Sequence, residues 1–144
     1  MAPGLRNTLA VIAGFVLGSA VNMGLIMAGS ILIPPPPGVD VTDTESVKAS
    51  MHLFEAKHFV TPFVAHAGGT LVGALVAWLI AVGNRSMPAW IIGAMFFVGG
   101  IYASRLFPAP GWFVATDLVL AYLPMAWLAV RIGQAVSPDK GATV

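Results

Sequence analysis

The chain has 144 residues, of which 58% are apolar and only 9% are charged, and its mean hydropathy is +0.87. Soluble domains carry roughly 25% charged residues, so the composition excludes a soluble enzyme; it also excludes a disordered protein, because so apolar a chain gains by hiding its surface from water. The net charge of +1, with Lys and Arg scattered singly, excludes a nucleic-acid-binding surface, and the absence of cysteine excludes disulfides and thiolate metal sites.

Four apolar windows divide the chain. About 20 apolar residues in a helix cross the roughly 30 Å hydrocarbon core of a bilayer. Windows of this kind cover residues 9–33, 62–82, 89–107 and 112–130. Backbone groups in hydrocarbon must be bonded within their own segment, so each window is predicted to be a helix. The expected fold is all-α: a polytopic membrane protein with a single domain, residues 1–144, built as an antiparallel four-transmembrane-helix bundle.

The first window ends at the proline run 34–37, which cannot continue a helix. A cleaved signal peptide is the alternative for this segment, with Arg6 as its charged region and the small residues 28–30 as its cleavage site. Signal-peptide cores are only about 7 to 15 residues long, which is shorter than this window. A retained membrane helix is therefore favoured.

Residues 34–61 form the outer segment, which carries four of the six acidic residues. Thr42 and Glu45 have the spacing of a capping box. Apolar residues then recur at i, i+4 and i+7, with charged and polar residues on the opposite side: Val47, Met51 and Phe54. This pattern predicts an extramembrane amphipathic helix over residues 43–59, lying flat on the headgroups or capping the outer end of the bundle.

The remaining windows are bounded by prolines. The second begins near Pro62, with Thr61 as its expected cap. The third and fourth are joined by the short loop 108–111. Pro124 removes a backbone hydrogen bond within the fourth window, so we expect a kink there, with a functional hinge as the alternative interpretation.

The positive residues predict the orientation. With the N-terminus inside, the inner face holds Arg6, Arg85, Arg131 and Lys140, and the outer face holds Lys48, Lys57 and Arg105. The inner face has only one more positive residue than the outer face, but the inner charges lie close to helix ends, where the positive-inside rule is strongest. We expect a multi-pass protein of the bacterial inner membrane with both termini cytoplasmic.

Small residues recur at every fourth position in the first two windows. The first stripe contains Gly14 and Gly18, and the second contains Gly69 and Gly73. In lipid, close packing depends on small residues that let helix backbones approach each other. These glycines are predicted to pack against a neighbouring helix of the chain, with oligomerisation through either stripe as the alternative.

Three ionisable residues are expected to share one layer near the outer end. At 1.5 Å per residue, Arg105 lies about 3 Å, His66 about 6 Å and Asp117 about 7 Å from the outer ends of their helices. A charge in hydrocarbon must be paired or hydrated. Because Arg105 and Asp117 flank the same hairpin, a salt bridge between them is expected. The alternative is a proton or cation site of Asp117 and His66 that opens outward.

A deeper polar layer is formed by Asn22, Thr70 and Tyr122, which lie about 12 to 16 Å from the outer ends. These side chains are predicted to hydrogen-bond to one another. Such contacts usually fix helix register, so a substrate pocket at this depth is the less favoured interpretation.

A set of metal-ligand residue types lies around the second window: His52, Glu55, His58 and His66. Successive i+3 steps spread His52 and His58 over an arc of about 120°, too wide for both to meet one ion from a straight helix. Metal binding is therefore not favoured, and no cofactor is predicted. The serines lack the setting of a nucleophile, so no catalytic residue is predicted.

Two blocks of sequence resemble a family of small uncharacterised bacterial membrane proteins. The first comprises residues 33–40 and 51–59, and the second is Tyr122-Leu-Pro-Met-Ala-Trp127. The resemblance implies a bacterial four-helix integral membrane protein and no known activity. The chain lacks the acidic residue in the middle of helix one that small multidrug transporters use, and it lacks the Arg, Asn and Glu pattern of membrane glutathione transferases.

Three functions are consistent with these patterns. The favoured one is a structural or accessory subunit of a larger inner-membrane assembly, with the lipid bilayer and a membrane-protein partner or a second copy of the chain as partners. The alternative is a small proton- or cation-linked transporter or channel that uses Asp117 and His66. The least favoured is a metal-dependent membrane enzyme.

Overall fold

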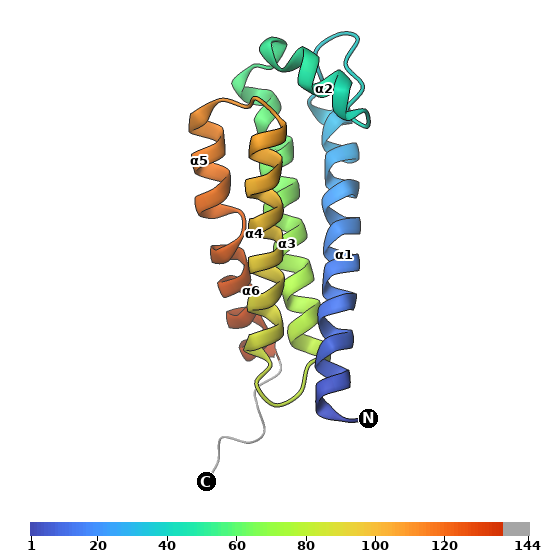
Figure 1. Ribbon diagram of the computed structural model, residues 1–144, viewed down its shortest axis with the longest axis vertical. Coiled ribbons are helices and arrows are strands. Elements are labelled where there is room, and N and C mark those ends of the chain that lie inside the picture. The colour runs from blue at the N-terminus through green and yellow to red at the C-terminus, as the bar shows by residue number, and fades with distance from the viewer. Residues whose placement is uncertain (137–144) are drawn as a thin grey trace.

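The computed structural model describes residues 1–136, which form a bundle of long antiparallel helices (Figure 1). The crossings are α1 (Pro3–Leu32), α3 (Val60–Ile80), α4 (Ser86–Leu106) and a divided fourth one, α5 (Gly111–Leu120) with α6 (Leu123–Val136). All four are long and apolar enough to cross a membrane. The predicted all-α class and four apolar helices are confirmed, with no strand in residues 1–136. Lys140, used for the orientation, lies outside the described residues.

The helix ends differ from the apolar windows. α1 begins at Pro3 rather than residue 9, and α6 ends at Val136 rather than residue 130. Hydropathy marks only the part of a helix that suits hydrocarbon, whereas the backbone hydrogen bonding continues into the polar ends. α3 begins at Val60, so Thr61 lies inside the first turn and does not cap the helix as predicted.

The centre of the bundle is α3, which contacts α1, α4, α5 and α6. It meets α1 along the two glycine stripes: a Cβ added at Gly14 would lie 2.5 Å from the Gly73 carbonyl oxygen, and one at Gly18 would lie 2.7 Å from the Gly69 carbonyl oxygen. The two backbones are therefore in direct contact. Both glycine stripes are therefore buried in a contact between two helices of the same chain.

The inner half of the bundle is filled by small side chains around one large one. Trp78 of α3 is 2% exposed and packs among alanines of α3, α4 and α6 together with Ile92 and Val130. Gly133 lies directly against the Trp78 indole, so no larger residue fits there. The side chains of this half therefore pack closely around Trp78.

The inner end is held by the start of α1. The Asn7 side chain donates to the Val82 carbonyl oxygen (3.2 Å) and accepts from the Val82 N–H (2.9 Å), while Arg6 Nε donates to the Ile80 carbonyl oxygen at 2.7 Å. These bonds satisfy backbone groups left free where α3 ends.

Asn7→Ala should therefore destabilise the fold by about 1 to 3 kcal/mol, because it leaves both polar groups of Val82 without their partner. Unfolding of the variant by SDS in mixed micelles measures the loss. Asn84→Ala, in the exposed part of the neighbouring loop, is the matched control and should change stability by less than about 0.5 kcal/mol. Equal stability of the two variants would contradict the prediction.

The outer segment forms a cap of three short helices, α2 (Thr44–Ser50), η1 (Met51–Leu53) and η2 (Ala56–Phe59). The single helix predicted over residues 43–59 is wrong: the chain is extended at Phe54 and Glu55, which separates η1 from η2. The capping box predicted at Thr42 is also wrong, because the Asp43 side chain accepts from the Glu45 N–H and caps α2.

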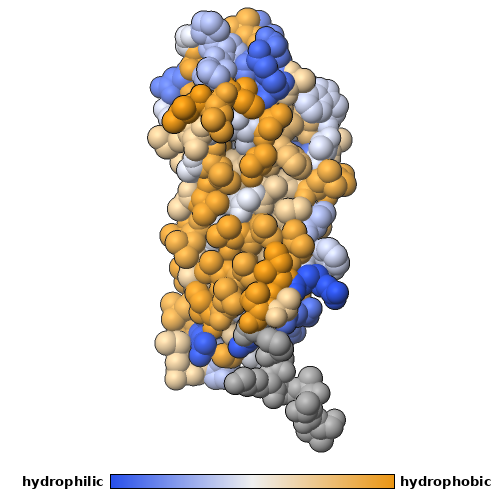
Figure 2. Space-filling view, turned by 180° about the vertical axis from the view of Figure 1, so that it is seen from behind, coloured by the Kyte–Doolittle hydropathy of each residue, from blue (hydrophilic) through white to orange (hydrophobic). Residues whose placement is uncertain are grey.

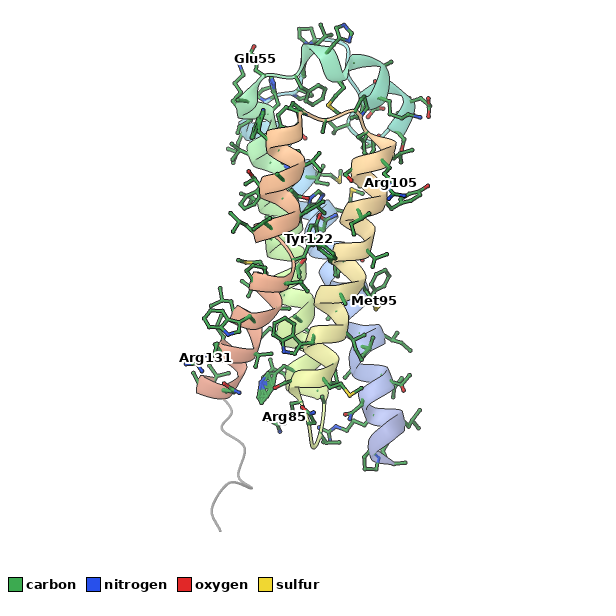
Figure 3. The ribbon with its side chains drawn as sticks, turned by 60° about the vertical axis from the view of Figure 1, so that its left-hand side comes forward. Glu55, Arg85, Met95, Arg105, Tyr122 and Arg131 are labelled. Carbon is green, nitrogen blue, oxygen red and sulfur yellow. The ribbon has the colours of Figure 1, made fainter. Side chains whose placement is uncertain are left out.

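The surface has an apolar middle between polar ends (Figure 2). Large apolar side chains such as Val16 and Val98 are more than half exposed along this belt. Hydrophilic residues gather on the cap and at the inner end, where Arg85 and Arg131 lie (Figure 3). A belt of this kind is what a bilayer covers.

Candidate functional site

A cluster of three polar side chains lies between α3, α5 and the start of α6. His66 Nδ1 is 2.9 Å from Asp117 Oδ1 and 3.0 Å from Oδ2, and the Tyr122 hydroxyl donates to Asp117 Oδ2 at 2.7 Å. Asp117 and Tyr122 are only 5% and 2% exposed. The tyrosine oxygen is also 3.1 Å from His66 Nδ1. The Asp117 carboxylate is thus hydrogen-bonded within the bundle by two neighbouring side chains.

The break in the fourth crossing brings Tyr122 to this cluster. α5 ends at Leu120, α6 begins at Leu123, and the residues between them form a bend. Pro124 has no N–H for the Leu120 carbonyl, so a continuous helix is disfavoured at this point. The expected kink is therefore a complete break. On an unbroken helix Asp117 and Tyr122 would face about 140° apart, whereas the bend turns both toward His66.

Neighbouring helices hold the cluster in place. Thr70, one turn below His66 on α3, donates its hydroxyl to the His66 carbonyl oxygen at 2.8 Å. The tyrosine ring stacks on His66 at a centroid distance of 5.9 Å and packs edge-on against Phe97 of α4. Gly100 of α4 leaves room for its hydroxyl, because a Cβ there would lie 2.5 Å from the Tyr122 oxygen.

Arg105 takes no part in the cluster. Its side chain is exposed and extends away from the bundle, whereas Tyr122 lies between the helices (Figure 3). The expected Arg105–Asp117 salt bridge is wrong, because His66 and Tyr122 bind the carboxylate instead. The residues of the alternative site, Asp117 and His66, are the ones in contact.

The deeper polar layer does not form. Tyr122 bonds to Asp117 and Thr70 bonds to a backbone carbonyl, so neither reaches Asn22. Within residues 1–136, the buried Oδ1 atom of Asn22 has no hydrogen-bond partner. Asn22 instead packs against Gly69, continuing the contact between α1 and α3.

A cavity of about 210 Å³ separates the cluster from the cap. His66 and Asp117 line it together with apolar residues of α1, α4 and α5. The three predicted apolar residues of the cap also face it: Val47, Met51 and Phe54. Sequence patterning therefore identified the inward face of the cap although it missed the breaks.

The candidate metal ligands are dispersed. His58 Nδ1 accepts from the Glu55 N–H at 2.8 Å, and its ring lines the cavity at the cap end. His52 is exposed. No group of three His, Asp or Glu side chains in the described part of the chain is arranged to hold a metal ion.

Two carboxyl groups of the cap have a lowered pKa. Hydrogen bonds from the Thr42 hydroxyl (2.7 Å) and N–H (2.8 Å) lower the pKa of Asp40, and the Lys57 ammonium, 3.0 Å away, lowers that of Glu55. Both groups are ionised at neutral pH. The outer end of the cavity thus lies beneath a charged, hydrated surface.

These features define a multi-pass helical membrane protein with an Asp–His–Tyr cluster inside its bundle. Comparisons of the chain with known protein families, with curated proteins and with solved structures find no match. The chemistry of the cluster itself is that of proton binding: a carboxylate orients an imidazole whose other nitrogen, Nε2, has no partner among residues 1–136.

Proposed function

We propose that the protein is a small proton-linked transporter or channel of the bacterial inner membrane in which His66 and Asp117 bind the translocated proton. One observation carries the proposal: the His66–Asp117 pair lies within the apolar part of the bundle and lines a cavity. Ionisable pairs at membrane depth usually mark ion or proton pathways, because isolated charges are costly in hydrocarbon.

The proton would be taken up at His66 Nε2. Asp117 accepts the hydrogen bond that His66 donates from Nδ1. Protonation of His66 at Nε2 therefore creates an imidazolium beside a carboxylate, and the two charges compensate each other. The Tyr122 hydroxyl keeps the carboxylate bonded in both states. The break beside Asp117 also supports the proposal, since transporters commonly build their sites at discontinuous helices.

An accessory-subunit role is the competing proposal. The glycine stripes that motivated it are buried between α1 and α3, so they are not available to a partner. In either role we propose that both termini lie on the cytoplasmic side. Arg85 and Arg131 lie at the end opposite the cap (Figure 3), and Arg6 bonds to Ile80 at the same end of α3.

Proton flux into liposomes tests the transport proposal. The purified chain, reconstituted around an enclosed pH-sensitive dye, should speed acidification of the lumen when the outside is made acidic, and Asp117→Asn should return the rate to that of empty liposomes. The amide cannot compensate an imidazolium. Arg105→Gln, which removes an exposed charge from the same end, should keep the wild-type rate. Wild-type flux through a folded Asp117→Asn variant would contradict the proposal.

A further inference from the structure

The two histidines that line the cavity have opposite hydrogen-bonding roles, because one presents an acceptor to it and the other a donor. A carboxylate only accepts, so His66 Nδ1 carries the hydrogen toward Asp117 and Nε2 presents a lone pair. At the cap end, His58 Nδ1 accepts from the Glu55 N–H, which leaves the hydrogen on Nε2. The cavity therefore has an acceptor at its deep end and a donor at its cap end.

The walls between the two histidines are apolar and partly aromatic. Phe54, Phe59 and Phe113 line the cavity, and their rings contact one another or His58. The hydroxyls of Ser30 and Ser104 also belong to the lining, but each donates to a carbonyl of its own helix. Among the described residues of the lining, the two histidines and the Thr61 hydroxyl therefore keep unused hydrogen-bonding capacity, and the histidines mark the two ends of the cavity.

The volume suits a compound of one ring. Cavities of about 150 Å³ with apolar walls take up benzene, and this one measures about 210 Å³. The cavity lies between the outer parts of α1, α3, α4 and α5, and its mostly apolar walls suit a ligand that dissolves in lipid.

We propose that the cavity binds a neutral, lipid-soluble phenol that carries a carbonyl at its far end. The phenolic hydroxyl donates to His66 Nε2, the carbonyl accepts from His58 Nε2, and the ring packs among the phenylalanines. This inference rests on the proposed transport function, for which it names the substrate class: weakly acidic, membrane-permeant aromatic compounds.

Calorimetric binding of two esters to the protein in nanodiscs tests the inference, with empty nanodiscs as the blank. Propyl 4-hydroxybenzoate has the phenol and the carbonyl, and propyl 4-methoxybenzoate has a methyl group in place of the donor hydrogen. The phenol should bind about tenfold more tightly, because the ether leaves Nε2 unpaired. Simple partitioning into lipid gives the opposite order, since the ether is the more apolar compound. Equal or reversed affinities would therefore overturn the inference.

Variants identify the acceptor. His66→Asn keeps an N–H for Asp117 but has no counterpart of Nε2, so it should lose the preference for the phenol. Ser104→Ala, which alters the same cavity wall, should keep it. Leu118→Trp fills the cavity and should abolish binding of both esters, a result that does not depend on the folding of His66→Asn. A phenol preference that survives in folded His66→Asn would overturn the assignment.

Proton flux through the same purified protein, reconstituted in dye-loaded liposomes, separates the two proposals. Phenol-specific binding by a protein without proton flux supports the binding site and overturns transport. Flux that depends on Asp117, without a preference for the phenol, supports transport and overturns the substrate class.

Discussion

Gly14→Leu should destabilise the bundle by at least about 3 kcal/mol, the upper range for overpacking a close contact. The added side chain would begin 2.5 Å from the Gly73 carbonyl oxygen and 3.0 Å from the Ala77 Cβ, and backbone cannot move aside as a flexible side chain can. α1 must then separate from α3. SDS titration in mixed micelles, followed by tryptophan fluorescence, measures the free energy of unfolding.

Gly24→Leu is the control within the same helix. A Cβ at Gly24 meets nothing within 4 Å, so leucine there extends into lipid and should change stability by less than about 0.5 kcal/mol. Gly14→Leu and Gly24→Leu are the same substitution in the same helix, so the two variants differ only in what the new side chain meets. Similar losses in both variants would show that the cost arises from helix propensity or insertion and not from the contact with α3.

Gly100→Val should abolish proton flux although it removes no polar group. The new side chain would occupy the position of the Tyr122 hydroxyl, 2.5 Å from a Cβ at this residue, and would expel the tyrosine from Asp117. The carboxylate then loses one of its two donors inside the bundle, a loss worth about 1.5 to 3 kcal/mol for a bond to a charged group. Flux into dye-loaded liposomes and unfolding in SDS measure the two effects.

Gly99→Val provides a control one residue away on α4. No atom lies within 4 Å of a Cβ at Gly99, so this variant should retain both flux and stability. If the two variants lose flux equally, the position of the Tyr122 hydroxyl does not matter for the proposed function.

The fold was largely predictable because its physical cause is simple. Each crossing needs a run of apolar residues of fixed length, and the prolines and glycines between the runs stop the helices, so four windows predict four helices. The glycine spacing likewise predicted which faces of α1 and α3 lie together, since a repeat of four keeps residues on one side of a helix. The cap was less predictable, because short amphipathic segments are readily interrupted by tertiary contacts.

The site was predicted only in part, because counting residues along a helix gives depth and not direction. Asp117 of α5 and His66 of α3 lie at the same depth, on the faces of their helices that point toward each other, and their side chains are in contact. Arg105 shares the depth but lies about 140° around α4 from Gly100, on the side away from the cluster. Counting residues places Tyr122 in a deeper layer, because it assumes a continuous helix; the break near Pro124 instead turns the Tyr122 side chain toward Asp117.

The divided fourth crossing has a consequence for how the chain is made. α5 with ten residues rises about 15 Å and α6 with fourteen about 21 Å, so neither covers the roughly 30 Å of hydrocarbon alone. The translocon must therefore release them together. Because only a tight proline loop joins them to α4, residues 86–136 are expected to enter the bilayer as one hairpin, after α1 and α3 have formed the surface that receives it.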